Sequence, residues 1–161
     1  PCSLDYLDSG KNVIGLRTFS KAYGLAGIRI GYGFAPEAIV DGINRAREPF
    51  NVNSLAQVAA VAALEDDQHL GRTLANNRTG MTVITEALRR HGATIYPSFA
   101  NFVFADLHRL TRPIFQAIME RGVIVRPGDI FGAPTCLRIS IGTPEENRLF
   151  VEALDSVLQP A

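Results

Sequence analysis

The stretch at residues 18–32 reads TFSKAYGLAGIRIGY and contains Lys21, one of only two lysines in the chain. It follows an apolar run at residues 12–17, which predicts a buried strand, and the alternation at 28–34 predicts a second strand. Lys21 is therefore expected at a strand end beside a glycine-rich turn, where its amine is partly desolvated. Desolvation lowers the pKa of an ammonium group and frees the amine as a nucleophile. Placement alone also fits a lysine that extends from a strand end into solvent.

The neighbours of Lys21 favour a phosphate site. Thr18 and Ser20 supply hydroxyl groups, the turn at 24–27 can expose backbone N–H groups, and Arg29 supplies a guanidinium group. These are the donors that bind a phosphate dianion. The spacing matches neither the dinucleotide-binding fingerprint nor the P-loop. A reactive lysine beside a phosphate site suggests an aldehyde cofactor with its own phosphate, and pyridoxal phosphate fits that description.

Residues 18–32 closely resemble the cofactor-lysine segment of fold-type I aminotransferases. The form with TFSK and GLAGIRIGY resembles the histidinol-phosphate aminotransferases in particular. The resemblance continues through the segments at 49–57, 101–103, 126–128 and 137–142 and so covers nearly the whole chain. It implies pyridoxal-phosphate-dependent transamination, with histidinol phosphate as the amino donor and 2-oxoglutarate as the 2-oxo acid.

The resemblance assigns roles to six residues. Lys21 would bond covalently to the cofactor and later move the proton between the substrate α-carbon and the cofactor. The cofactor phosphate would be held by Thr18, Ser20 and Arg29. Arg126 and Arg138 would face the anionic groups of the two substrates. Without the resemblance, these two arginines would be interpreted as exposed charges at strand ends.

The resemblance also implies an enzyme that forms a homodimer with its sites at the subunit interface. The two cysteines, which form no disulfide framework, predict a cytoplasmic location. Three alternatives stay open at this point. Two use the same cofactor: an aromatic amino-acid aminotransferase, and a decarboxylase of a phosphorylated amino acid. The third is a non-catalytic α/β module that keeps the fold as an interaction surface.

The rest of the pattern predicts an α/β fold in two unequal parts. The resemblance implies that residues 1–65 form the C-terminal part of a large cofactor-binding domain and that residues 66–161 form a small C-terminal domain. Predicted helices lie between Pro36 and Pro49, at 55–65, 67–91 and 113–121, and after a Thr143 cap. Predicted strands follow Gly92 at 93–96, 102–105, 123–125 and 137–141. The helix at 55–65 is apolar nearly all round, which predicts burial on several sides.

Composition excludes several other classes. Lys and Arg number 16 and Asp and Glu number 16, so the formal net charge is zero. That balance argues against a nucleic-acid partner and against a membrane surface. No apolar run approaches the ~20 residues of a membrane-spanning helix. Cys2 and Cys136 lack metal-ligand spacing and the histidines are isolated, so we expect no metal site and a reducing compartment.

The chain is expected to be the C-terminal part of a longer enzyme. In the family, an aspartate that pairs with the pyridine nitrogen lies upstream of the lysine, and neither Asp5 nor Asp8 matches its spacing. The expected position falls before Pro1. We therefore expect the 161 residues alone to bind the cofactor weakly and not to transaminate.

Overall fold

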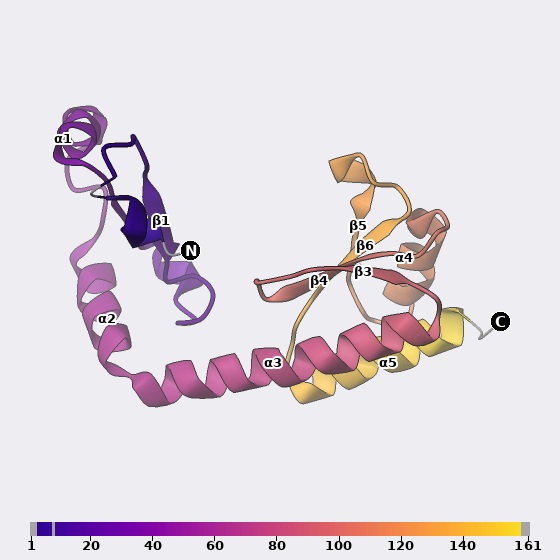
Figure 1. Cartoon of the computed structure of the whole chain (residues 1–161). Coiled ribbons are helices and arrows are strands. Elements are labelled where there is room, and N and C mark those ends of the chain that lie inside the picture. The colour runs from indigo at the N-terminus through magenta and orange to yellow at the C-terminus, as the bar shows by residue number, and fades with distance from the viewer. Residues whose placement is uncertain (1–2, 8, 159–161) are drawn as a thin grey trace. The chain divides into compact units, whose positions relative to one another are not determined.

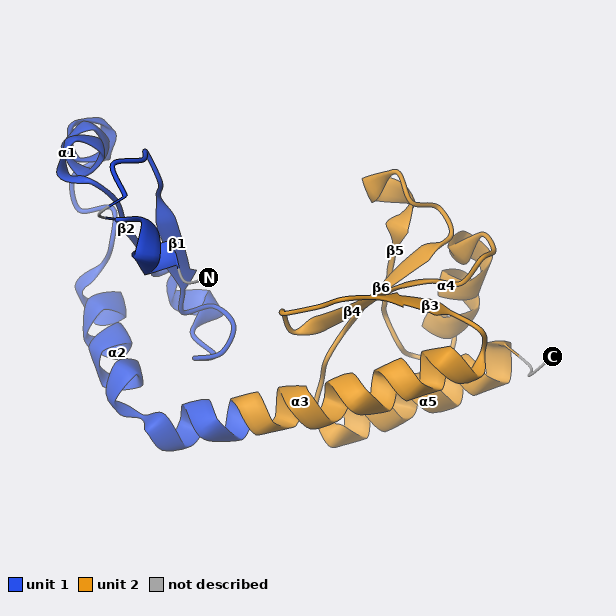
Figure 2. Cartoon of the chain, in the orientation of Figure 1, with its two compact units in different colours: residues 1–73 blue, residues 74–161 orange. Residues whose placement is uncertain are grey.

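The computed structural model describes residues 3–7 and 9–158, so Pro1, Cys2 and Asp8 lie outside the described residues. The chain forms two compact units, residues 1–73 and residues 74–161 (Figure 2). The boundary between them falls within one helix, α3 (Asp67–Arg90). The mixture of helices and strands confirms the predicted α/β class. The functional domain boundary expected after residue 65 stays a prediction.

The first unit contains a two-stranded antiparallel sheet. β1 (Gly15–Thr18) pairs with β2 (Gly31–Phe34), with Thr18 opposite Gly31. A Cβ atom on Gly31 would lie 2.7 Å from the backbone oxygen of Arg17, closer than a side chain permits. The pairing therefore requires glycine at position 31.

The returning strand is shorter than predicted. Ala26–Ile28 form a 3-10 helix, η2, and Arg29 follows in the left-handed conformation with a φ of 55°. The prediction of a strand over the whole of 28–34 is therefore wrong at its start. The reason is a loop closure, in which the N–H of Phe19 donates to the carbonyl of Ile30 at 3.3 Å. β1 likewise begins later than the run that predicted it.

The remaining elements of the first unit are helical. A 3-10 turn, η1 (Ser3–Tyr6), precedes β1, and α1 (Glu37–Ala46) and α2 (Ser54–Glu65) follow β2. On α2 only Ala56 and Ala60 are buried. Four large apolar side chains of α2 are exposed: Leu55, Val58, Val61 and Leu64. The prediction that this helix is buried on several sides is wrong for this chain, because no described element covers these side chains.

The second unit is a four-stranded antiparallel sheet with helices against it (Figure 1). The strand order is β3-β4-β6-β5, with β3 at Thr94–Tyr96, β4 at Phe102–Asp106, β5 at Arg126–Pro127 and β6 at Cys136–Ser140. The helices are α3, α4 (Thr111–Met119) and α5 (Pro144–Val157), and η3 (Gly128–Phe131) is a short 3-10 helix. The strand predicted at 123–125 is wrong, because pairing begins only where Arg126 lies opposite Arg138.

One face of this sheet packs on the helices and the other is open. Val103 and Ala105 of β4 and Leu137 and Ile139 of β6 are buried in a core shared with α3, α4 and α5. Their sequence neighbours point to the opposite face, since strand side chains alternate. That face carries partly exposed residues: Tyr96, Phe102, Phe104, Arg138 and Ser140.

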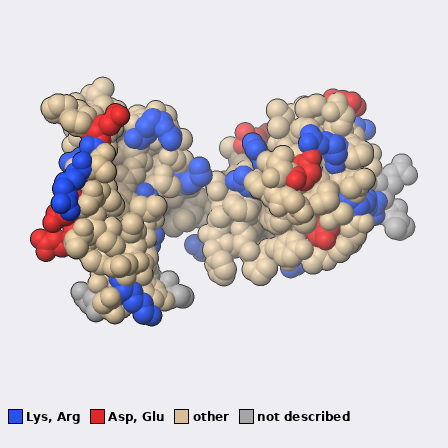
Figure 3. All heavy atoms as spheres, turned by 90° about the horizontal axis from the view of Figure 1, so that it is seen from above, with Lys and Arg blue, Asp and Glu red and all other residues tan. Residues whose placement is uncertain are grey.

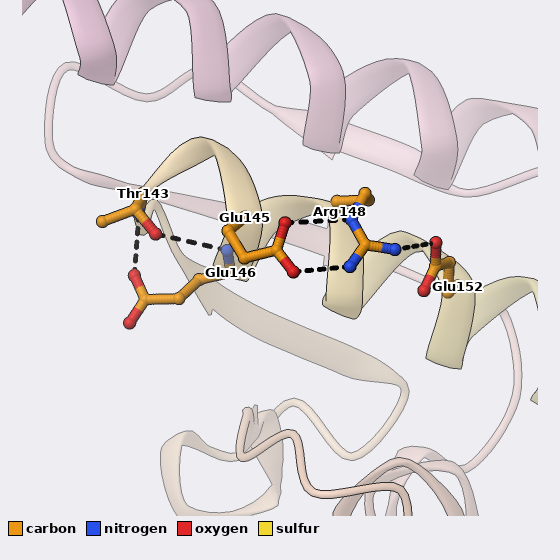
Figure 4. A network of polar contacts seen from close by, with 5 residues as sticks. All are labelled: Thr143, Glu145, Glu146, Arg148 and Glu152. Atoms are coloured by element: carbon orange, nitrogen blue, oxygen red, sulfur yellow. Dashed lines mark hydrogen bonds and ion pairs between the residues drawn. The ribbon is translucent and has the colours of Figure 1, made fainter.

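The start of α5 agrees with its sequence signal. The Thr143 hydroxyl accepts the N–H of Glu146 at 3.2 Å, and the Glu146 carboxylate accepts the N–H of Thr143 at 2.7 Å (Figure 4). Pro144 occupies the first turn, where its missing N–H has no partner to lose. The predicted Thr143 cap is thus confirmed, and together with Glu146 it forms a capping box. Farther along, Arg148 pairs with Glu145 and Glu152 on the exposed side of the helix.

Charged side chains are dispersed over the surface. On the face shown in Figure 3, basic and acidic residues are interspersed with larger uncharged areas. Within residues 3–7 and 9–158, no helix is long and apolar enough to cross a membrane.

Candidate functional site

The turn that carries Lys21 is organised by Phe19. The Phe19 ring is buried and contacts the rings of Tyr23 and Tyr32, at centroid distances of 5.0 and 5.8 Å. Its carbonyl accepts the N–H of Leu25 at 2.9 Å, which closes the loop after β1. The chain therefore bends around Phe19 and leaves Lys21 on the outside of the bend.

An open pocket of about 580 Å³ lies beside this turn. Thr18, Ser20 and Arg29, which the sequence predicted as phosphate ligands, all line it. The Thr18 hydroxyl accepts the N–H of Ser20 at 3.1 Å, and Arg29 Nη1 donates to the carbonyl of Ala26 at 2.6 Å. Two hydroxyl groups and a guanidinium group thus meet at one pocket, which is a donor set suited to a phosphate dianion.

Arg17 lines the same pocket, and it was not among the residues predicted from the sequence. Its guanidinium donates to the Leu16 carbonyl at 2.9 Å and to the Ser3 hydroxyl at 3.0 Å. A second positive charge makes the pocket more favourable for an anion. The position of Arg17 directly before Thr18 could have indicated that it belongs to the pocket. However, neighbouring residues of a strand point to opposite faces, which favoured the opposite interpretation.

Lys21 does not line this pocket, and its side chain is exposed. The expectation of a partly desolvated amine is therefore wrong for the described chain. The reason is local, because the bend buries the Phe19 ring and leaves the Lys21 side chain exposed. Lys21 still follows Ser20 directly, so its backbone adjoins the pocket.

The second unit brings the other two predicted residues together. Arg126 on β5 lies directly opposite Arg138 on β6, and both line a pocket of about 320 Å³ with Ile124, Val125 and Ser140. Like charges directly opposite on neighbouring strands repel each other. Among the described residues, neither guanidinium group forms a hydrogen bond or an ion pair with a protein side chain or carbonyl. An anion bound between them would relieve that repulsion.

Aromatic rings adjoin the arginine pair on the open face of the sheet. The Arg138 Cζ lies 4.3 Å from the centroid of the Phe102 ring, and its Nε is buried without a hydrogen-bond partner. Phe104 is the register partner of Arg138 on β4, but its ring contacts Tyr96 at 5.8 Å. The sequence singled out 101–103 only by resemblance, and the contact of Phe102 with Arg138 was not predicted.

Other reactive groups do not form a site of their own. In the part of the chain that the structure describes, no three His, Cys, Asp or Glu side chains gather as metal ligands would. Cys136 is buried, and burial raises the pKa of its thiol. A thiol with a raised pKa is a poor nucleophile at neutral pH.

Comparison with known proteins places these features in a family context. The sequence pattern of the family described as aminotransferase class I and II matches residues 3–154. A histidinol-phosphate aminotransferase from Moorella thermoacetica is 50% identical over 159 residues, which are 98% of this chain and 41% of that protein. One from Akkermansia muciniphila is 49% identical over 98% of this chain and 43% of its own length. The chain therefore spans about two fifths of the length of these curated relatives.

A solved structure shares the fold and holds a cofactor. The crystal structure of a histidinol-phosphate aminotransferase from Sinorhizobium meliloti, in complex with pyridoxal 5′-phosphate, superposes with a TM-score of 0.84 and is 31% identical. The match covers 97% of this chain and 44% of that one. The fold of this chain is thus similar to part of an enzyme that binds this cofactor.

Proposed function

Because the chain belongs to the class I and II aminotransferase family, we propose that it serves pyridoxal-phosphate-dependent transamination between histidinol phosphate and 2-oxoglutarate. The observation that carries the proposal is the pocket of the first unit. Two hydroxyls and one guanidinium group converge there, and Lys21 follows Ser20 of this pocket directly in the sequence. The names of the relatives at about half identity support the choice of substrate class.

The residues of the first unit fit the phosphate of the proposed cofactor. Thr18 and Ser20 would donate their hydroxyl hydrogens to phosphate oxygens, and Arg29 would add a charge-assisted fork. Arg17 would supply a second positive charge at the same pocket. When bound, pyridoxal phosphate withdraws electrons from the substrate α-carbon and so weakens its C–H bond. Lys21 would attach the cofactor covalently and, once released, accept that proton on Nζ.

The arginine pair of the second unit would bind substrate. Arg126 and Arg138 present two guanidinium groups that repel each other until an anion lies between them. Carboxylates and phosphates match the planar fork of arginine, and both proposed substrates carry such groups. This pair would therefore select anionic substrates and hold them by bidentate hydrogen bonds.

Reductive trapping tests the cofactor lysine. The whole protein is incubated with pyridoxal phosphate, reduced with borohydride, digested and analysed by mass spectrometry. We expect a pyridoxyl mass on the peptide with Lys21 and none on the peptide with Lys11, the internal control. Labelling of Lys11 alone, or equal labelling of both lysines, would contradict the assignment.

A second candidate reaction has structural support. An L-threonine-O-3-phosphate decarboxylase from Porphyromonas gingivalis superposes with a TM-score of 0.79 at 26% identity, over 96% of this chain and 49% of that one. A decarboxylase of a phosphorylated amino acid would use the same cofactor residues. Product analysis separates the two reactions, since transamination yields a 2-oxo acid and glutamate, whereas decarboxylation releases carbon dioxide.

A further inference from the structure

Arg138 is held by an aromatic ring instead of by polar partners. Its Cζ lies 4.3 Å from the centroid of the Phe102 ring, while its Nε is buried without a hydrogen-bond partner. The two residues lie on adjacent strands, since Phe102 faces Ser140 in the β4–β6 register, two positions after Arg138. The ring of Phe102 thus lies against this guanidinium group, which forms no hydrogen bond or ion pair with the described residues.

The Arg138 guanidinium group needs a contact that holds its orientation. Arg126 lies directly opposite Arg138 across β5 and β6, and repulsion between the two charges favours rotation of either side chain into solvent. The ring quadrupole attracts a cation over its face, so Phe102 opposes that rotation for Arg138. The ring uses only the face of the guanidinium group and leaves the N–H donors, which lie in its plane, free for a ligand.

We propose that Phe102 is a positioning residue, whose ring holds the Arg138 guanidinium group ready for the carboxylate or phosphate of the substrate. This inference rests on the proposed function and adds a residue to it. A guanidinium group that is already oriented loses less conformational entropy on binding an anion. Phe102 therefore acts on the affinity for the anion and not on the rate of the chemical step.

Phe104 provides a matched control on the same strand. It is another phenylalanine of β4 with its side chain on the same face, and it is the direct register partner of Arg138. Its ring, however, packs against Tyr96. If loss of any ring on this face disturbed the sheet equally, Phe104→Leu would act like Phe102→Leu.

The test measures anion affinity in the whole protein. Binding of inorganic phosphate, KM for 2-oxoglutarate and kcat are compared for the wild type and for Phe102→Leu, Phe102→Tyr and Phe104→Leu. For Phe102→Leu we expect Kd and KM to rise about tenfold, with kcat within about twofold. Phe102→Tyr, which keeps the ring, and Phe104→Leu should stay within about twofold of the wild type. Equal effects of the two leucine variants, or none from Phe102→Leu, overturn the proposal.

A spectroscopic measurement on the unaltered protein covers the case in which Phe102→Leu does not fold. The Nε–H resonance of Arg138, identified by its loss in Arg138→Lys, should be shifted upfield by the ring current of Phe102. A resonance at the position of a free arginine overturns the proposal. The proposed reaction and the positioning role of Phe102 can be refuted separately. If phosphate binding depends on Phe102 but no 2-oxo acid is formed, the proposed reaction alone is refuted. Transamination with an unchanged KM in Phe102→Leu refutes the positioning role alone.

Discussion

Gly80 is a residue at which α3 lies close to Ile141, which follows β6, and to Asn147 of α5. A Cβ atom there would lie 2.4 Å from Ile141 Cγ2 and 2.6 Å from Asn147 Nδ2. Asn147 is itself buried. Its Oδ1 accepts the N–H of Gly142 at 3.0 Å, and its Nδ2 donates to the carbonyl of Gly142 at 3.2 Å. Glycine in a helix interior costs stability relative to alanine, and this close contact gives the reason for glycine at position 80.

We predict that Gly80→Ala destabilises the chain by about 1–3 kcal/mol, because the added methyl group overpacks a filled contact. Chemical denaturation gives the free energy of unfolding. Gly71→Ala is the matched control on the same helix, since nothing lies within 4 Å of its Cβ position. That variant should stabilise the chain by about 0.5–1 kcal/mol. Equal effects at both positions would contradict the packing argument.

The pKa of Glu145 also depends on one neighbour. Hydrogen bonds from Arg148 hold the pKa of the Glu145 carboxyl below its ordinary value, and both side chains are exposed. A lowered pKa in the folded state means that the carboxylate stabilises the fold above its unfolded pKa. That contribution is lost as the pH falls through the folded pKa.

We therefore predict that Arg148→Ala lowers the free energy of unfolding at neutral pH, and that the difference from the wild type shrinks as the pH falls below about 4. Added salt should also reduce this difference in the free energy of unfolding, because the Glu145–Arg148 ion pair is exposed to solvent. Arg121→Ala is the control, since Arg121 bonds to the Ala117 carbonyl and to no carboxylate. Denaturation curves from pH 7 to pH 3 provide the measurement, and a difference for Arg148→Ala that does not depend on pH would refute the prediction.

At the scale of elements, α5 depends on its first turn. Thr143 satisfies one of the free N–H groups of the helix start through its hydroxyl. We predict that Thr143→Ala costs about 1 kcal/mol of stability, and that Thr143→Ser, which keeps the hydroxyl, costs less than about half of that. Thermal unfolding of the three chains measures both effects, and equal losses for serine and alanine would argue against the cap.

The elements also show where sequence reasoning succeeds. The start of α5 and the long α3 were predicted because caps and helical periodicity act within a few residues. The start of β2 was not predicted correctly, because the left-handed conformation of Arg29 and the turn before it depend on loop closure around Phe19. The prediction that α2 is buried was wrong for a related reason. Its apolar composition shows that the helix favours burial, but burial also requires another element that packs against it.

The residues of the candidate site also differ in how far the sequence could predict them. The hydroxyl and guanidinium groups of Thr18, Ser20 and Arg29 are typical phosphate donors, which is why the sequence grouped them, and they line one pocket. Their role as phosphate ligands stays a prediction. Arg126 and Arg138 came from resemblance alone, since their spacing in sequence does not reveal that they face each other across two strands. The ring of Phe102 was missed because it reaches Arg138 diagonally across the sheet.

At the scale of the whole molecule, α2 exposes a large apolar area. Leu55 is 80% exposed and Val58 is 70% exposed. Exposed apolar areas of this kind mark interaction surfaces. We predict that the chain self-associates as its concentration rises and that Val58→Glu reduces the association. Leu110→Glu, at an exposed apolar residue of the second unit, is the control. Sedimentation velocity measures both, and equal behaviour of the two variants would contradict a role for α2.

A final prediction concerns the 161 residues by themselves. Lys21 is exposed and its pocket is open, so the described chain gives the cofactor little enclosure. We predict that the isolated chain does not transaminate and that borohydride traps little cofactor on Lys21. A coupled assay for glutamate measures turnover, and a rate equal to that of the whole protein would refute the prediction.

The two faces of the sheet in the second unit are subject to different demands. Val103 and Leu137 face the helices, and any change there alters how the unit holds together. Tyr96 and Phe104 face away from that core, so their replacement leaves the packing behind the strands in place. Substitutions on the open face therefore change that surface without requiring compensating changes in the helices.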